Sequence, residues 1–173
     1  MSSHDEHPST SHNVTCRPEL RAAHVTDIEP MYELIGEAAE QTSVLPRSQD
    51  NLAQYLRDFT VAIHQDRIVG CGALNVITRD LAEIRTVVVA PAWRGHGVGR
   101  LLVQRLVEEA RQLQIQRVFA LTDHVPFFER LGFRLTPKST LPHKIWTECV
   151  YCPKFHHCPE QAVDLLMDPP EDA

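Results

Sequence analysis

The chain has 173 residues, 43% of them hydrophobic, so it can bury the core of a single domain. Its formal net charge is −6 and its basic residues form no block, which argues against a nucleic-acid-binding surface. Five cysteines without a secretion signal argue against a disulfide framework, and no apolar run approaches the roughly 20 residues that span a bilayer, so we expect a cytoplasmic protein without membrane contact.

The first part of the chain predicts one strand and two helices. The strand covers residues 19–23, and Asp27 is placed to cap a helix because Pro30 is tolerated only in a first turn. The apolar residues of this helix recur at spacings of three and four: Ile28, Met31, Tyr32, Ile35 and Ala39. A second helix is expected over 49–57, with Leu52, Tyr55 and Leu56 turned inward.

Three strand-like runs follow at residues 59–64, 68–76 and 81–89, joined by turns at 65–67 and 78–80, and they predict an antiparallel meander. A glycine-rich turn leads into a helix over 98–113, whose apolar stripe is Val98, Leu102, Leu106, Ala110 and Leu113. The remaining predicted elements are a strand (117–121), a helix (126–131) ending at Gly132, a strand (133–135) and a last short helix near 160–166. Because helices separate the strands in only part of the chain, the sheet should be mixed.

The turn before the third helix carries the strongest chemical signal. Residues 87–100 read Val-Val-Val-Ala-Pro-Ala-Trp-Arg-Gly-His-Gly-Val-Gly-Arg. Glycines at a helix start expose backbone N–H groups at the positive end of the helix dipole, which suits a pyrophosphate. In a dinucleotide-binding unit the third glycine would come one residue after Gly99, and a P-loop would need a following Gly-Lys-Ser/Thr. A purely structural glycine turn is the remaining alternative.

The strand ending in Val-Val-Val, followed by Arg-x-x-Gly-x-Gly, resembles the acyl-CoA site of the GCN5-related N-acetyltransferases (GNAT), and the resemblance spans residues 19–135. It implies a single α/β acyltransferase domain with a mixed, mostly antiparallel twisted sheet flanked by helices. We place this domain at residues 16–140, after a disordered polar tail (1–15) and before a Lys/Trp/Cys-rich extension (141–167) packed on it and an acidic tail (168–173).

The same resemblance implies acetyl-CoA as co-substrate. It would place the pantetheine arm against the backbone of Val87, Val88 and Val89. The phosphates would lie on Arg94, Gly95, His96, Gly97, Val98, Gly99 and Arg100. Glycine lets the backbone approach phosphates closely, and arginine adds charge.

Further segments resemble the short, stand-alone bacterial N-acetylglutamate synthases. These segments are 45–48, 69–74, 82–86, 127–133 and the tail 144–160. The resemblance implies transfer of acetyl to the α-amine of L-glutamate, the first step of arginine biosynthesis. The amino-acid-kinase-like domain of the long synthases has no room in 173 residues.

The residue types suit this acceptor. Glutamate has two carboxylates, for which the arginine fork is well shaped, and Arg47, Arg85 and Lys144 are the candidates to bind it. Glu83 is the candidate general base for the amine, directly or through water. With a period of two, Glu83 and Arg85 are expected on the face of Val87 and Val89, with Ile84 and Val88 on the other. The plain alternative is an ordinary ion pair on a sheet face.

The leaving thiolate has no evident proton donor. Many GNAT proteins have a tyrosine after the fifth strand, and the matching position here is Phe128. Thr122, Asp123, His124 or water remain open as donors, and the backbone N–H groups of residues 87–89 are expected to stabilise the oxyanion.

A zinc site in the tail is a minor alternative, with Cys149, Cys152 and Cys158 and the nearby His156 and His157 as ligands. Cys149 and Cys152 have the spacing of half a zinc site, but His156, His157 and Cys158 are too crowded for the other half, so we expect no metal. Anchoring of the tail by packing is the simpler interpretation, and Cys16 and Cys71 are expected to be packing residues.

Several functions remain open. The acceptor can be glutamine, another amino acid, a polyamine or a protein, although the three basic candidates favour an anion. A non-catalytic acyl-CoA or arginine sensor and a zinc-stabilised interaction module are alternatives from other classes. A homodimer is one open assembly state.

Overall fold

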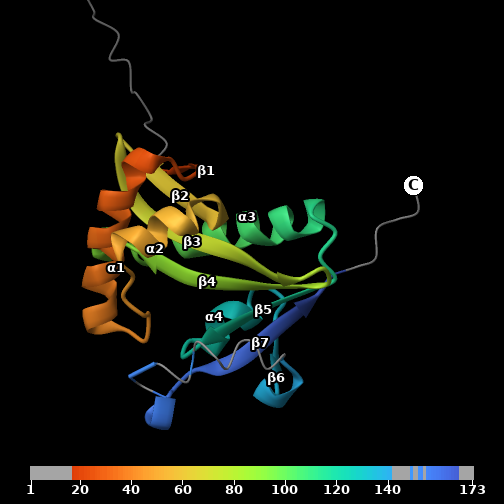
Figure 1. Ribbon diagram of the computed structural model, residues 1–173. Helices are drawn as coiled ribbons and strands as arrows, with labels where there is room; N and C mark the ends of the chain where they lie inside the picture. The colour runs from red at the N-terminus through yellow and green to blue at the C-terminus, as the bar shows by residue number, and fades with distance from the viewer. Residues whose placement is uncertain (1–16, 142–148, 150–151, 154, 168–173) are drawn as a thin grey trace, which may run out of the picture.

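The computed structural model describes residues 17–141, 149, 152–153 and 155–167 (Figure 1). Its strands are β1 (Glu19–Ala22), β2 (Phe59–His64), β3 (Arg67–Thr78), β4 (Leu81–Val89), β5 (Arg117–Thr122), β6 (Arg134–Thr136) and β7 (Gln161–Leu166). Its α-helices are α1 (Ile28–Gln41), α2 (Gln49–Gln54), α3 (Val98–Gln112) and α4 (Val125–Glu129). None of the helices in these residues is long and apolar enough to cross a membrane.

The strands form one sheet in the order β1-β2-β3-β4-β5-β7-β6. β4 and β5 pair in parallel, and the other neighbouring pairs are antiparallel. The predicted mixed, mostly antiparallel sheet is therefore confirmed. The parallel pair arises because α3 carries the chain across the sheet between β4 and β5.

Different helices cover the two faces of the sheet (Figure 1). On the side that we call the α3 face, α3 and α4 pack over a core that includes Leu106, Val118 and Phe128. On the opposite side, the α1 face, α1 and α2 pack over Phe59 and Ala73. β4 therefore has α1 and α2 on one side of the sheet and α3 and α4 on the other.

The first helix differs in detail from its prediction. Asp27 does precede α1, but its carboxylate accepts hydrogen bonds from the His24 backbone N–H and from the Arg21 guanidinium, at 2.7 and 2.6 Å. The Arg21 bonds hold the pKa of Asp27 below its usual range. The buried stripe is Met31, Leu34, Ile35 and Ala38, and Tyr32 is exposed because it lies one residue off that stripe. Leu113, expected inside, is also exposed because α3 ends before it.

The expected helix near residues 160–166 is wrong, because Gln161–Leu166 forms strand β7. Ala162 and Val163 are both buried, and they contact the cores of opposite sheet faces. β7 bonds to β5 on one side and to β6 on the other. Strand pairing on both edges outweighs the local preference of a six-residue segment.

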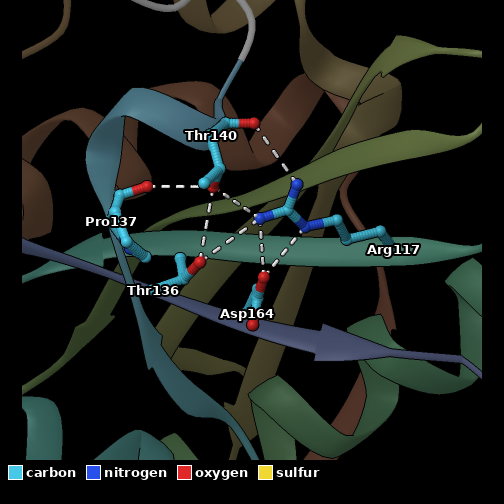
Figure 2. A network of polar contacts seen from close by, with 5 residues as sticks. All are labelled: Arg117, Thr136, Pro137, Thr140 and Asp164. Atoms are coloured by element: carbon cyan, nitrogen blue, oxygen red, sulfur yellow. Dashed lines mark hydrogen bonds and ion pairs between the residues drawn. The ribbon is translucent and has the colours of Figure 1, made fainter.

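A polar network joins three segments of this half of the sheet (Figure 2). Arg117 on β5 donates from Nε and Nη2 to one carboxylate oxygen of Asp164 on β7, at 2.9 and 2.6 Å. Nη2 also donates to the Thr140 hydroxyl at 3.0 Å, and that hydroxyl donates to the Pro137 carbonyl. The network thereby fixes residues 137–141 over the sheet, where Leu141 is buried.

Replacing Asp164 by alanine is expected to reduce the free energy of unfolding by about 1–2 kcal/mol, because a half-buried guanidinium loses its carboxylate. The matched control is Glu108→Ala, which breaks the exposed Glu108–Arg111 pair on α3 and should cost less than about 0.5 kcal/mol. Urea unfolding measures both changes. Equal midpoints for the two variants would contradict a stabilising role of the network.

Candidate active site

A cleft opens where β4 and β5 separate. The two strands pair only from Leu81 to Glu83 on β4, opposite Arg117 to Phe119 on β5. Beyond this point they diverge, as Figure 1 shows. The cleft has a volume of about 1200 Å³ and is lined by residues 83–89, 93–95, 97–100, 121–124, 127–128 and 130–131, with 41–45 and Arg47 on the side of α1. It is large enough for an extended ligand that reaches the backbone of β4.

A bulge in β4 shapes the edge of this cleft. Ala73 on β3 pairs with Arg85 and Cys71 pairs with Val88, so Gly72 lies opposite two residues of β4. One of these, Thr86, has a φ of 54°, in the left-handed region that β-branched residues avoid. Strain of this kind clusters at functional sites.

The bulge reverses the alternation of side chains along β4. The α1 face carries Glu83, Arg85 and Val88, and the α3 face carries Ile84, Val87 and Val89. The prediction that grouped Glu83 and Arg85 with Val87 and Val89 is therefore wrong, because strict alternation fails where an extra residue is inserted. The acid and the arginine do share a face, as expected, but they share it with Val88.

Glycines in β3 were the sequence signal for this distortion. A Cβ on Gly70 would come within 3.0 Å of the Val88 carbonyl oxygen, and one on Gly72 within 3.1 Å of the Leu106 side chain. Glycine inside a strand indicates a bulge or a close approach of backbone or helix. Both occur here.

The glycine-rich turn has the geometry of an anion site. Gly95 and Gly97 have φ of 77° and 81°, and Gly97 precedes α3 without a side-chain cap. The first N–H groups of α3 therefore face the cleft without acceptors from their own helix. Arg94 lines the cleft and donates from Nε to the Val89 carbonyl at 3.3 Å, which joins the turn to β4, and Arg100 also lines the cleft.

His96 differs from its neighbours in the turn. Its side chain is not part of the cleft lining, and Nδ1 lies 3.0 Å from the Arg94 carbonyl oxygen. Its ring meets the edge of Trp93, which also contacts His64. A contact of His96 with a bound phosphate would thus come from the backbone.

Two of the predicted acceptor-binding residues meet at the bulge. Arg47, from the segment between α1 and α2, donates from Nε to the Thr86 hydroxyl and from Nη1 to the Asn51 amide oxygen, both at 2.9 Å. The Arg85 side chain is only 8% exposed and its guanidinium lies over the Tyr55 ring, 5.1 Å from the ring centre. The site therefore has two cations on the α1 face.

A second contact orients Arg85. Its Nη2 lies 4.0 Å from a carboxylate oxygen of Asp58, and the Asn75 amide donates to the same oxygen at 3.0 Å. Asn75 also pairs with Glu83 across β3 and β4, so its side chain is on the face of Glu83. Sequence reasoning missed Thr86, Asn51, Asp58 and Asn75, whose residue types carry no signal before the fold is known. Lys144, the third basic candidate, lies outside the described residues.

The aromatic residue at the tyrosine position is structural. Phe128 is buried and makes edge-to-face contacts with Phe127 and Phe133, with ring centres 5.1 and 5.2 Å apart. It lines the cleft but cannot donate a proton. Nearby, the buried Thr122 hydroxyl accepts the His124 backbone N–H at 2.9 Å.

One of the tail cysteines reaches the site. Cys149 and Glu160 line the cleft, and burial raises the pKa of both side chains. No group of three or more histidine, cysteine or acidic side chains among the described residues is arranged to hold an ion. Cys71 is fully buried and its pKa is raised to about 12, which confirms its packing role.

Comparison with known proteins gives consistent relatives. Residues 25–133 match the family model described as the acetyltransferase (GNAT) family. A Mycobacterium tuberculosis protein named amino-acid acetyltransferase is 45% identical over 121 residues, which cover 68% of this chain and 69% of the relative.

Two solved structures are also similar. The crystal structure of Rv2747 from M. tuberculosis in complex with CoA and NLQ has a TM-score of 0.74 and 34% identity, over 87% of this chain and 100% of that one. N-acetylglutamate synthase from Neisseria gonorrhoeae, complexed with coenzyme A and N-acetyl-glutamate, has a TM-score of 0.78 and 25% identity. That match covers 87% of this chain but 35% of the gonococcal chain.

Proposed function

Because the chain belongs to the acetyltransferase (GNAT) family and is an acetyl-CoA-dependent acetyltransferase, we propose that it acetylates the α-amine of L-glutamate to give N-acetyl-L-glutamate and CoA. The observation that carries the proposal is the pair Arg47 and Arg85 on the α1 face, beside Glu83 and the bulge. The relative named amino-acid acetyltransferase and the synthase complexed with N-acetyl-glutamate support the same acceptor class, and with it a place in arginine biosynthesis.

Acetyl-CoA would enter the cleft from the side of α3 and α4. The turn fits the pyrophosphate, because a Cβ on Gly95 or Gly97 would meet no atom within 4 Å and both positions border the cleft. Arg94, Val98, Gly99, Arg100 and the His96 backbone complete the proposed phosphate site. The edge of β4 at Val87, Val88 and Val89 that faces away from β3 is not paired with β5, so backbone groups on that edge can bind the pantetheine arm, with the Val89 carbonyl also accepting from Arg94 Nε.

The acceptor would bind from the α1 face, where Arg47 and Arg85 receive its carboxylates and Lys144 is proposed to assist. Glu83 takes a proton from the ammonium, directly or through water, and the free amine attacks the thioester carbonyl. The C–N bond forms first and gives a tetrahedral intermediate with an oxyanion. Its collapse breaks the C–S bond, CoA leaves as a thiolate, and the second proton of the amine passes to that thiolate directly or through water. N–H groups of the bulged strand would stabilise the oxyanion between these two steps.

The first test is release of CoA thiol from acetyl-CoA by the purified protein across glutamate, glutamine, aspartate, other amino acids and spermidine. We expect turnover with glutamate, a lower rate with aspartate and none with spermidine. Binding of CoA without turnover of any amino acid would overturn the proposed acceptor.

The phosphate turn has its own test in Gly97→Ala. The added Cβ would enter open space at a position that lines the cleft and narrow the room for a phosphate, so we expect the KM for acetyl-CoA to rise about tenfold. We also expect a loss of about 1 kcal/mol of stability from the positive φ. Gly132→Ala is a matched control, because Gly132 also has a positive φ, of 92°, but lies outside the cleft lining. It should lose similar stability and keep the KM. A similar KM in both variants would argue against phosphate binding at the turn.

A further inference from the structure

Acetyl-CoA has two separate anionic groups, a pyrophosphate within the chain and a single phosphate on the 3′ oxygen of its adenosine. The turn before α3 offers backbone N–H groups for the first. The 3′-phosphate is separated from the pyrophosphate by the ribose, so the N–H groups at the start of α3 that bind the pyrophosphate do not also bind it. A protein contact with the 3′-phosphate needs a separate cation.

A cation is available on the neighbouring helix. α4 packs on the first turn of α3, since the Phe127 ring lies within 3.5 Å of the Cβ position of Gly99. Arg130 follows Phe127 by three residues and keeps helical backbone angles, so it is on the same side of α4. Both residues line the cleft, and Glu129 between them does not. Arg130 is thus about one helical turn from the contact with α3.

Besides Arg47, Arg85 and Arg94, the cleft lining has two arginines on its helical side. Arg100 and Arg130 are on α3 and α4, and neither side chain makes a hydrogen bond or ion pair with any residue that the structure describes. The acids that line the cleft, Glu83, Asp123 and Glu160, are on or beside the strands. Arg130 is exposed, so its charge can meet a phosphate without prior loss of another partner.

We propose that Arg130 binds the 3′-phosphate of acetyl-CoA and makes the enzyme prefer acetyl-CoA to acetyl-dephospho-CoA. The inference rests on the proposed placement of acetyl-CoA in the cleft. The two arginines then bind different phosphates. Arg100 lies at the turn near the pyrophosphate, and Arg130 contacts the 3′-phosphate, which dephospho-CoA lacks.

The experiment compares CoA with dephospho-CoA, by calorimetric Kd for the free thiols and by KM for their acetyl forms. The wild-type protein should favour the 3′-phosphorylated forms about tenfold. Arg130→Gln should weaken them by about this factor and leave the dephospho forms unchanged, so that the preference disappears. Arg130→Lys should keep part of it, and higher salt should reduce it in the wild type.

Two further variants make the test specific. Arg100→Gln should weaken both coenzymes equally, and Arg134→Gln, an exposed arginine on β6 outside the cleft lining, should weaken neither. Urea midpoints check that all variants are folded. Full preference in Arg130→Gln, loss of preference in Arg100→Gln, or no preference in the wild type would each overturn the inference. The Kd for CoA is measured without an acceptor. If glutamate is not turned over, that result contradicts the proposed acceptor and leaves the role of Arg130 untouched.

Discussion

Glu83→Gln is expected to reduce kcat for glutamate acetylation by about 10²–10⁴-fold, because the amide cannot accept the proton of the attacking ammonium. Glu83 is the last residue of β4 that pairs with β5, and the cleft begins there. Pairing with β5 therefore holds its backbone in place. The KM for acetyl-CoA should stay within about twofold, since the proposed phosphate and pantetheine contacts are on other residues. Steady-state kinetics at several pH values measure both quantities.

Glu160→Gln is the control for this variant, because it removes a second carboxyl that lines the same cleft. It should change kcat by less than about tenfold if proton transfer is specific to Glu83. Raising the pH should recover part of the activity of Glu83→Gln, as more of the free amine is present without a base. If Glu83→Gln retains more than a tenth of the wild-type kcat, Glu83 is not the general base.

Arg85→Gln is expected to raise the KM for glutamate about 10- to 100-fold, because a buried charge-assisted contact with a carboxylate is lost. The KM for acetyl-CoA should change little. Arg85→Lys should recover only part of the affinity, since an ammonium keeps the charge but not the bidentate fork. Initial rates with glutamate, glutamine and aspartate show which acceptors depend on this residue.

Asp58→Asn separates binding from packing. Asp58 does not line the cleft, but its carboxylate oxygen lies 4.0 Å from the Arg85 guanidinium, so its loss should weaken the positioning of Arg85. We expect a smaller rise in the KM for glutamate than in Arg85→Gln, without a change for acetyl-CoA. If both variants lower thermal stability and neither changes the KM for glutamate, Arg85 is a structural residue only.

The sequence predicted the elements that have a strong period or a clear turn. α3 and the meander β2–β3–β4 were placed closely, because apolar spacing and turn residues agree there. β7 could not be identified, since six residues with little alternation do not distinguish helix from strand. Its strand conformation depends on pairing with β5 and β6, which are distant from it in the sequence.

The candidate site was predictable in its residues but not in its geometry. The glycine turn was identified from its motif, and Arg47, Arg85 and Glu83 were candidates from their residue types and the family resemblance. All of these residues except His96 border one cleft. The bulge at Thr86 was not foreseen, because threonine rarely adopts a positive φ and only the glycines of β3 indicated it. Contacts such as that of Asp58, just before β2, with Asn75 on β3 exist only once separate segments are assembled.

The position of β7 has a consequence for synthesis of the protein on the ribosome. β6 is an edge strand that joins the sheet through β7, although β7 is translated after it. A nascent chain that already contains β5 and β6 therefore exposes the edge of β5 that faces away from β4 until residues 161–166 emerge. Such an intermediate is prone to wrong pairing between chains, so a slow or stalled ribosome before this segment should favour aggregation over folding.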